Sequence, residues 1–93
     1  MNDFPQGPDG RQLKLLVLGS ESWAAKARDL GVHALYLPGP LSQAAAEATV
    51  EQEGCHGLIS DGRDYDLGST IPCWQSDADP KGVVAYFQSG PLG

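Results

Sequence analysis

The sequence is poor in cysteine, in basic residues and in long apolar runs. Its 93 residues include two cysteines, Cys55 and Cys73, which form no CxxC pair. A disulfide framework or a compact zinc site needs more cysteines or a tighter spacing, so neither is predicted. Free thiols in a reducing compartment are expected instead.

Basic residues are scarce because six Lys and Arg stand against twelve Asp and Glu, which gives a net charge of −6. Duplex nucleic acid is bound by clustered Lys and Arg that displace counterions, so this composition argues against duplex binding. An acidic surface is compatible with binding of a basic protein partner and with mimicry of nucleic acid. It also keeps a small domain in solution. These three interpretations stay open at this point.

Long apolar runs are absent, since no stretch approaches the roughly 20 residues of a membrane-spanning helix. Residues 1–8 lack the basic region and apolar core of a signal peptide, so we expect a cytoplasmic protein without a membrane partner. Residues 1–11 hold two prolines and two glycines and predict a flexible arm. Residues 12–89 are expected to form a single domain, and residues 90–93 a loose tail.

The most apolar stretch spans residues 13–18, which are aliphatic except for Lys14. A nearly continuous apolar run is typical of a strand that is covered on both faces. Gly19 and Ser20 end the run, and apolar residues then recur at helical spacing up to Gly31. This pattern predicts an amphipathic helix with Ser20 as its N-cap.

Two further strands are predicted over 32–37 and 55–60, with a helix from Leu41 or Ser42 to Glu53 between them. The apolar face of that helix is expected to carry a leucine and three alanines, namely Leu41, Ala44, Ala45 and Ala48. Alternation of strands and helices implies a parallel sheet with right-handed crossovers. The most apolar strand belongs in the middle, so we predict the strand order 2-1-3.

The pattern changes in the last third of the chain. Residues 61–69 are too polar and too short for a crossover helix, whereas residues 70–74 and 83–87 are β-like. Pro72 confines the first of these two strands to an edge, and residues 79–82 predict a turn. Whether the two strands form a hairpin or flank the third strand separately stays open. The predicted fold is a small three-layer α/β domain, flavodoxin-like or half-Rossmann, with a mixed sheet.

The predicted topology also locates a crevice. In open α/β sheets, ligands bind beyond the carboxyl ends of the strands, at the point where the strand order reverses. That point lies here between the first and third strands. Its candidate lining comes from the loops after these strands and from the Pro-Gly-Pro turn, and comprises Ser20, Glu21, Ser22, Gly39, Asp61, Arg63 and Asp64. The loop at 19–22 lacks both phosphate-binding glycine signatures, which favours a tight turn with a helix cap.

A second hypothesis comes from three carboxylates within six residues, Asp61, Asp64 and Asp66, which together offer oxygen ligands for Mg²⁺ or Ca²⁺. A glutamate after the first strand and acids after a later strand resemble the metal site of the Toprim domain of primases and topoisomerases, over residues 13–68. The resemblance implies Glu21 as general acid/base and the aspartates as metal ligands. The chain departs from the Toprim pattern, which has Asp-x-Asp at the strand end, because an arginine, Arg63, stands in place of the second acid. Turns in a surface loop are the structural interpretation of the same aspartates.

These observations leave two hypotheses of function. Catalytic groups at recognised spacing are missing from the sequence and its charge is acidic, so we expect a non-enzymatic regulatory or protein-interaction module without a cofactor. Such a module would bind a protein partner or a small-molecule ligand. The rival hypothesis is a metal-dependent phosphoryl-transfer or nucleotide-processing enzyme that uses Mg²⁺, Glu21 and residues 61–66.

Overall fold

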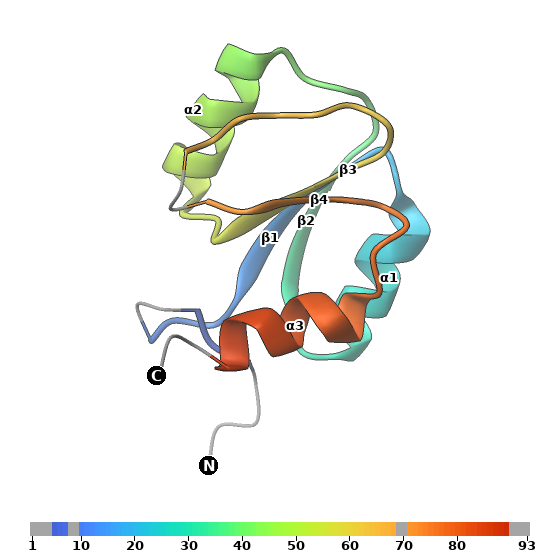
Figure 1. Cartoon of the computed structure of the whole chain (residues 1–93), viewed down its shortest axis with the longest axis vertical. Helices are drawn as coiled ribbons and strands as arrows, with labels where there is room; N and C mark the ends of the chain where they lie inside the picture. Colours follow the sequence, from blue (N-terminus) through green and yellow to red (C-terminus); the bar gives the residue numbers. More distant parts are fainter. Residues whose placement is uncertain (1–4, 8–9, 69–70, 90–93) are drawn as a thin grey trace.

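Four parallel strands and three helices make up the described part of the chain, which comprises residues 5–7, 10–68 and 71–89 of a computed structural model (Figure 1). In chain order the elements are β1 (Lys14–Leu18), α1 (Glu21–Asp29), β2 (His33–Leu37), α2 (Gln43–Glu53), β3 (Gly57–Ser60), β4 (Cys73–Gln75) and α3 (Pro80–Ser89).

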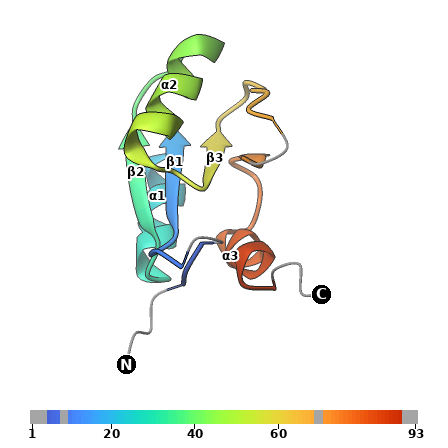
Figure 2. The ribbon, with the colours of Figure 1, turned by 90° about the vertical axis from the view of Figure 1, so that its left-hand side faces the viewer.

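The sheet has the order β2-β1-β3-β4, and every neighbouring pair of strands runs parallel. Figure 2 shows β2, β1 and β3 side by side with the same direction. Leu15, Leu16 and Val17 of β1 are fully buried. The predicted order 2-1-3, with the most apolar strand in the middle, is confirmed.

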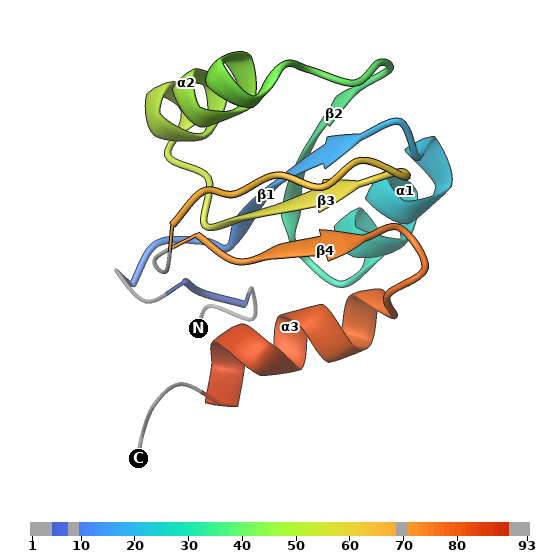
Figure 3. The ribbon, with the colours of Figure 1, turned by 45° about the horizontal axis from the view of Figure 1, so that its top comes forward.

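Helices cover both faces of the sheet (Figure 3). Leu15 and Val17 of β1 pack with α1 and α3 in one apolar core, whereas Leu16 and Leu18 pack with α2 in a second core. Successive side chains of a strand point to opposite faces, so an unbroken apolar run supplies both cores at once. The helices and the sheet therefore form three layers.

The ends of α1 and α2 follow their local sequence signals. The Ser20 hydroxyl accepts a hydrogen bond from the Trp23 amide, and Ser42 caps α2 in the same way. Gly31 after α1 and Gly54 after α2 both adopt the left-handed backbone conformation that favours glycine. The predicted Ser20 cap is confirmed.

The predicted apolar face of α2 is right only in part: Leu41, just before the helix, packs on the apolar core, and Ala45 is half-buried. Ala46 and Val50 are buried, while Ala44 and Ala48 are exposed. The four alanines of this helix are spread over more than half of its circumference, so their spacing does not define which side faces the sheet. The single valine sets the orientation, because it has more apolar surface to bury than any alanine.

The predicted last strand at 83–87 is also wrong, because these residues belong to α3. The carboxylate of Asp79 accepts a hydrogen bond from the Lys81 amide at 3.0 Å, and Pro80 occupies the first helical position. Both are start signals of a helix. Val83 and Phe87 are one turn apart and pack against the core of the α1 face. Capping and this spacing therefore outweigh the β-propensity of the segment.

The predicted mixed sheet is also wrong, because all strand pairs of the four-stranded sheet are parallel. The strand expected at 70–74 is β4, and it pairs parallel to β3 at the edge of the sheet. The carbonyl of Pro72 accepts a hydrogen bond from the Leu58 amide at 3.1 Å. Proline tolerates this position because only its carbonyl is used, which agrees with the predicted edge strand. Thr70 lies outside the described residues.

Part of the predicted arm lies against the body of the protein. The amide of Leu13 donates to the Pro5 carbonyl at 2.8 Å, and the Gly7 amide donates to the Arg11 carbonyl at 2.8 Å. Residues 1–4 of the predicted arm and the predicted tail at 90–93 lie outside the described residues. Each helix in the described ranges is too short or too polar to cross a membrane.

Candidate functional site

The predicted crevice at the carboxyl ends of β1 and β3 is small. Leu18 and Ser60 are register partners, so the loops that follow these strands start side by side. A Cβ atom placed on Gly19 would lie 3.1 Å from the Cβ of Asp61, which shows that the two loops touch. The hollow between them measures about 160 Å³, and Pro38 and Pro40, on either side of Gly39, help to line it. The loops meet as predicted, but little space remains between them.

Three of the candidate residues in this crevice belong to the start of α1. Ser20 uses its hydroxyl as the helix cap, with a distance of 3.4 Å from the Trp23 nitrogen. Glu21 and Ser22 are exposed in the first turn of the helix. A carboxylate at this end complements the positive end of the helix dipole, which is a sufficient structural role for Glu21.

The other candidates bind neighbouring parts of the chain. Asp61 accepts a hydrogen bond from the Ser76 hydroxyl at 3.1 Å, and Asp64 accepts one from the Gln75 side chain at 3.0 Å. The guanidinium carbon of Arg63 lies 5.7 Å from the centre of the Tyr65 ring, a cation–π contact. The two hydrogen bonds tie the loop after β3 to the end of β4 and the residue that follows it, whereas the cation–π contact lies within the loop after β3.

The predicted metal ligands have separate surroundings. Asp66 accepts a hydrogen bond from the Gly68 amide at 3.2 Å, so its carboxylate forms a local turn. As described above, the carboxylate of Asp61 accepts a hydrogen bond from Ser76, and that of Asp64 accepts one from Gln75. Within residues 5–7, 10–68 and 71–89, no group of three or more His, Cys, Asp or Glu side chains is arranged to hold a metal ion. The structure therefore does not bring these three carboxylates together.

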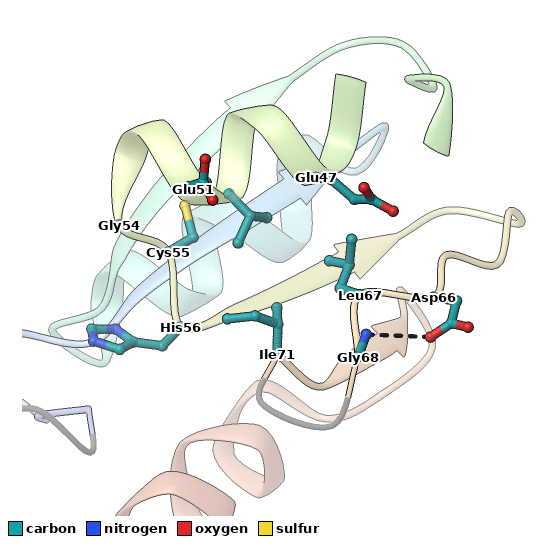
Figure 4. A pocket seen from close by; sticks show the side chains of 10 residues that line it. Glu47, Glu51, Gly54, Cys55, His56, Asp66, Leu67, Gly68 and Ile71 are labelled. Carbon is teal, nitrogen blue, oxygen red and sulfur yellow. Dashed lines mark hydrogen bonds between the residues drawn. The ribbon is translucent and has the colours of Figure 1, made fainter. Parts of the chain in front are cut away.

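A much larger groove lies elsewhere, between α2 and the facing segment that includes residues 66–68 and Ile71 (Figure 4). It encloses about 730 Å³, within the range typical of ligand sites. Its floor is apolar, and Val50 and Cys55 there are nearly inaccessible to water. Leu67 and Ile71 line the wall across from α2 and are half-buried.

The rim of this groove is acidic. Glu47 and Glu51 come from successive turns of α2, and Asp66 comes from the opposite wall; all three are exposed. The groove also reaches the C-terminal end of α2 at Gly54, where unsatisfied carbonyl groups carry a negative partial charge. Among the described residues of its lining, His56 is the one basic residue. The electrostatic field in the groove should therefore favour cations.

Two pairs of hydrogen bonds, here called clasps, hold the facing wall against the start of α2. The Tyr65 hydroxyl donates to the Leu41 carbonyl at 2.6 Å and accepts from the Leu41 amide at 3.0 Å. The Gln43 side chain donates to the Asp66 carbonyl at 2.6 Å and accepts from the Asp66 amide at 3.1 Å. Both clasps lie near the start of α2, so they fix one end of the wall, and the groove opens along the later turns.

The cysteine in the floor is a poor nucleophile. Burial raises the pKa of the Cys55 thiol to about 11, although the charge of Lys14 works in the opposite direction. The Lys14 ammonium is paired with Glu53 at 3.2 Å. Burial likewise raises the pKa of Cys73. A protonated thiol behaves as a small apolar group, so Cys55 adds to the apolar floor.

The sequence predictions missed this groove, although one signal for it was present. Tyr65, Leu67 and Ile71 are large apolar residues in a segment that is otherwise polar. Such residues in a loop need a surface to pack on, and α2 provides it. In comparisons with known proteins, no family model, no curated protein and no solved structure matches this chain.

Proposed function

We propose that this chain is a small, non-enzymatic interaction module that binds a protein partner through the groove between α2 and the segment at 66–68 and Ile71. The observation that carries this proposal is a groove of about 730 Å³ in which the half-buried Leu67 and Ile71 face α2 above an apolar floor. Apolar surface that such a groove leaves in contact with water gains free energy when an apolar group of a partner covers it. The crevice at Gly19 and Asp61, at about 160 Å³, offers much less surface.

The chemistry of the lining supports binding rather than catalysis by a nucleophile. The thiol of Cys55 stays protonated near neutral pH because burial raises its pKa to about 11. The His56 side chain accepts a hydrogen bond on Nδ1 from the Lys14 amide at 3.1 Å, so this nitrogen already has a structural use. Neither group is prepared to attack a substrate or to activate another group for attack.

Site-specific photo-crosslinking in the native cells tests this proposal. A benzophenone amino acid replaces Glu51 on the groove rim in one variant and Glu21 on α1 in a matched control. Both positions are exposed and helical. We expect one abundant protein adduct at position 51 and none at position 21. The proposal is wrong if position 51 gives no protein adduct, or if both positions give the same adducts.

The rival proposal, a metal-dependent phosphoryl-transfer or nucleotide-processing enzyme, has less support because Asp61, Asp64 and Asp66 contact different neighbours. A titration with Mg²⁺ or Mn²⁺, followed through amide shifts by NMR, distinguishes the two proposals. Shifts at Glu21 and residues 61–66 that vanish in Asp64→Ala would favour the enzyme. Absence of shifts at these residues would leave the interaction module.

We also infer a finer fold assignment. The order β2-β1-β3-β4, with α1 and α2 on opposite faces, agrees with the first four strands of a flavodoxin-like sheet, whereas a half-Rossmann unit has the order 3-2-1. In such folds the ligand crevice lies at the carboxyl ends of the strands. The groove proposed here lies along α2 instead, so its use would be a departure from that rule. We expect the protein in the cytoplasm, where both thiols would stay reduced.

A further inference from the structure

The charges around the groove define which kind of partner it can hold. α2 contains three glutamates and no basic residue. Glu53 is paired with Lys14, but Glu47 and Glu51 face the groove and carry no ion pair with the described residues. Asp66 adds a carboxylate from the opposite wall. A partner that enters between these walls meets negative charge on both sides.

The apolar floor sets a second requirement. Val50 and Cys55 lie at the bottom of the groove, and Leu67 and Ile71 line its side. An occupant made only of cations would leave the half-buried Leu67 and Ile71 side chains in contact with water. An occupant with an aliphatic side chain in the floor and an ammonium or guanidinium group at the rim satisfies both requirements.

The spacing of the rim carboxylates favours a chain with repeated cations. Glu47 and Glu51 are one helical turn apart, which places their Cβ atoms about 6 Å from each other. Side chains two residues apart in an extended peptide lie about 7 Å apart on one side of the chain. The residue between two such basic residues points to the opposite side of the chain, so an apolar residue there can enter the floor while the long side chains of the flanking residues bend to the two carboxylates at the rim.

We infer that the partner presents a basic, amphipathic protein segment in which Lys or Arg flanks a buried aliphatic side chain. This inference rests on the proposed function and adds the chemistry of the partner. Coulomb attraction at exposed carboxylates contributes little per pair, so the apolar side chain supplies most of the affinity and the flanking cations select the partner.

A dansyl-labelled peptide, Gly-Lys-Leu-Lys-Gly, blocked at both ends, is the probe. Its affinity for the full chain is measured by fluorescence titration. We expect saturable binding, a loss of at least about tenfold when Gly replaces Leu, and no binding when Glu replaces both Lys. Equal affinities for the three peptides would overturn the inference, and so would full competition by spermidine, which has the cations without a peptide anchor.

Charge variants of the protein show where the peptide binds. Glu51 makes no hydrogen bond or ion pair with the described residues, so Glu51→Gln changes the charge and little else. We expect Glu51→Gln to weaken binding about two- to fivefold and Glu51→Lys to weaken it further. Glu21→Gln and Glu21→Lys, at an exposed site on α1, are the matched controls and should leave the affinity unchanged. Equal effects at both positions would overturn the inference.

The outcomes separate this inference from the proposed function. A protein adduct at position 51 together with no binding of the basic peptide would overturn the inference and leave the proposed function in place. If neither a protein adduct at position 51 nor binding of the basic peptide is observed, both the inference and the proposed function are wrong. A second copy of this chain is another possible occupant, and sedimentation over a range of protein concentrations tests for it. Self-association that Glu51→Lys abolishes would assign the groove to a second copy and overturn the inference.

Discussion

The hydroxyl group of Tyr65 should be one of the most valuable single atoms for the stability of the groove wall. It forms two hydrogen bonds with the backbone of Leu41, at 2.6 and 3.0 Å, and the Tyr65 side chain is buried, with 8% of the residue exposed. Tyr65→Phe removes this oxygen and keeps the ring. The substitution leaves an amide and a carbonyl group at Leu41 without their partner.

The magnitude follows from the two lost bonds. A hydrogen bond contributes a net 0.5–1.5 kcal/mol on average, so two of them contribute about 1–3 kcal/mol to the free energy of unfolding. Leu41 is half-buried, and water can replace part of what is lost. We therefore expect a loss of about 1–2 kcal/mol. For a domain of this size, that loss lowers the melting temperature by about 4–16 °C.

Urea denaturation followed by tryptophan fluorescence measures this change. Tyr86→Phe is the matched control, since Tyr86 is 57% exposed and its hydroxyl has no hydrogen bond to the described residues. The control should stay within about 0.5 kcal/mol of the parent protein. If Tyr65→Phe is as stable as the control, the clasp does not hold the wall, and our explanation of the groove fails.

Three further predictions concern the packing, the last helix and the thiols. Gly57→Ala should lower the free energy of unfolding, measured by urea denaturation, by about 1–3 kcal/mol, because the new Cβ would lie 3.1–3.2 Å from side chains of β1, β4 and α3. Gly39→Ala is the control and should change this free energy little, because the space around Gly39 is open. Asp79→Ala should cost about 1 kcal/mol through loss of the α3 cap, and the exposed Asp77→Ala should be near neutral. Burial raises the pKa of Cys55 from 9.0 to about 11, so the unfolded chain loses this proton first as the pH rises. The free energy of unfolding should thus fall between about pH 9 and 11 and fall less steeply in Cys55→Ala; equal slopes would contradict the assigned burial.

The middle of the sheet was predictable because local sequence and final environment agree there. The aliphatic run at 13–18 requires cover on both faces, and the structure buries it between two helical layers. Ser20 and Gly54 mark helix ends by their own chemistry, without help from distant residues. Such signals act within a few residues, which is why the sequence alone was enough.

The segment at 83–87 was not predictable from its own composition. Valine, tyrosine and phenylalanine favour strands, but Asp79 and Pro80 start a helix just before them. Val83 and Phe87 then share one helical face and pack on the α1 side of the sheet. The cap and the helical spacing of these two buried residues together outweigh the β-propensity of the segment.

The groove was the least predictable feature, because two segments far apart in sequence create it. One link between them is the Gln43 side chain on the Asp66 backbone, a contact across 23 residues. No spacing rule connects such positions. The sequence predicted the aspartates as metal ligands, whereas in the structure Asp66 lines the wall of the groove and adds negative charge to its rim.

We propose that partners bind along α2 and not at the carboxyl ends of the strands. The most direct test is a map of backbone amide shifts by NMR, with the Lys-Leu-Lys peptide added to the full chain. We predict the largest shifts at Val50, Glu51, Cys55 and Leu67, with residues 19–22 unaffected. Largest shifts at residues 19–22 and 61–64, with none along α2, would place the binding site at the carboxyl ends of the strands instead.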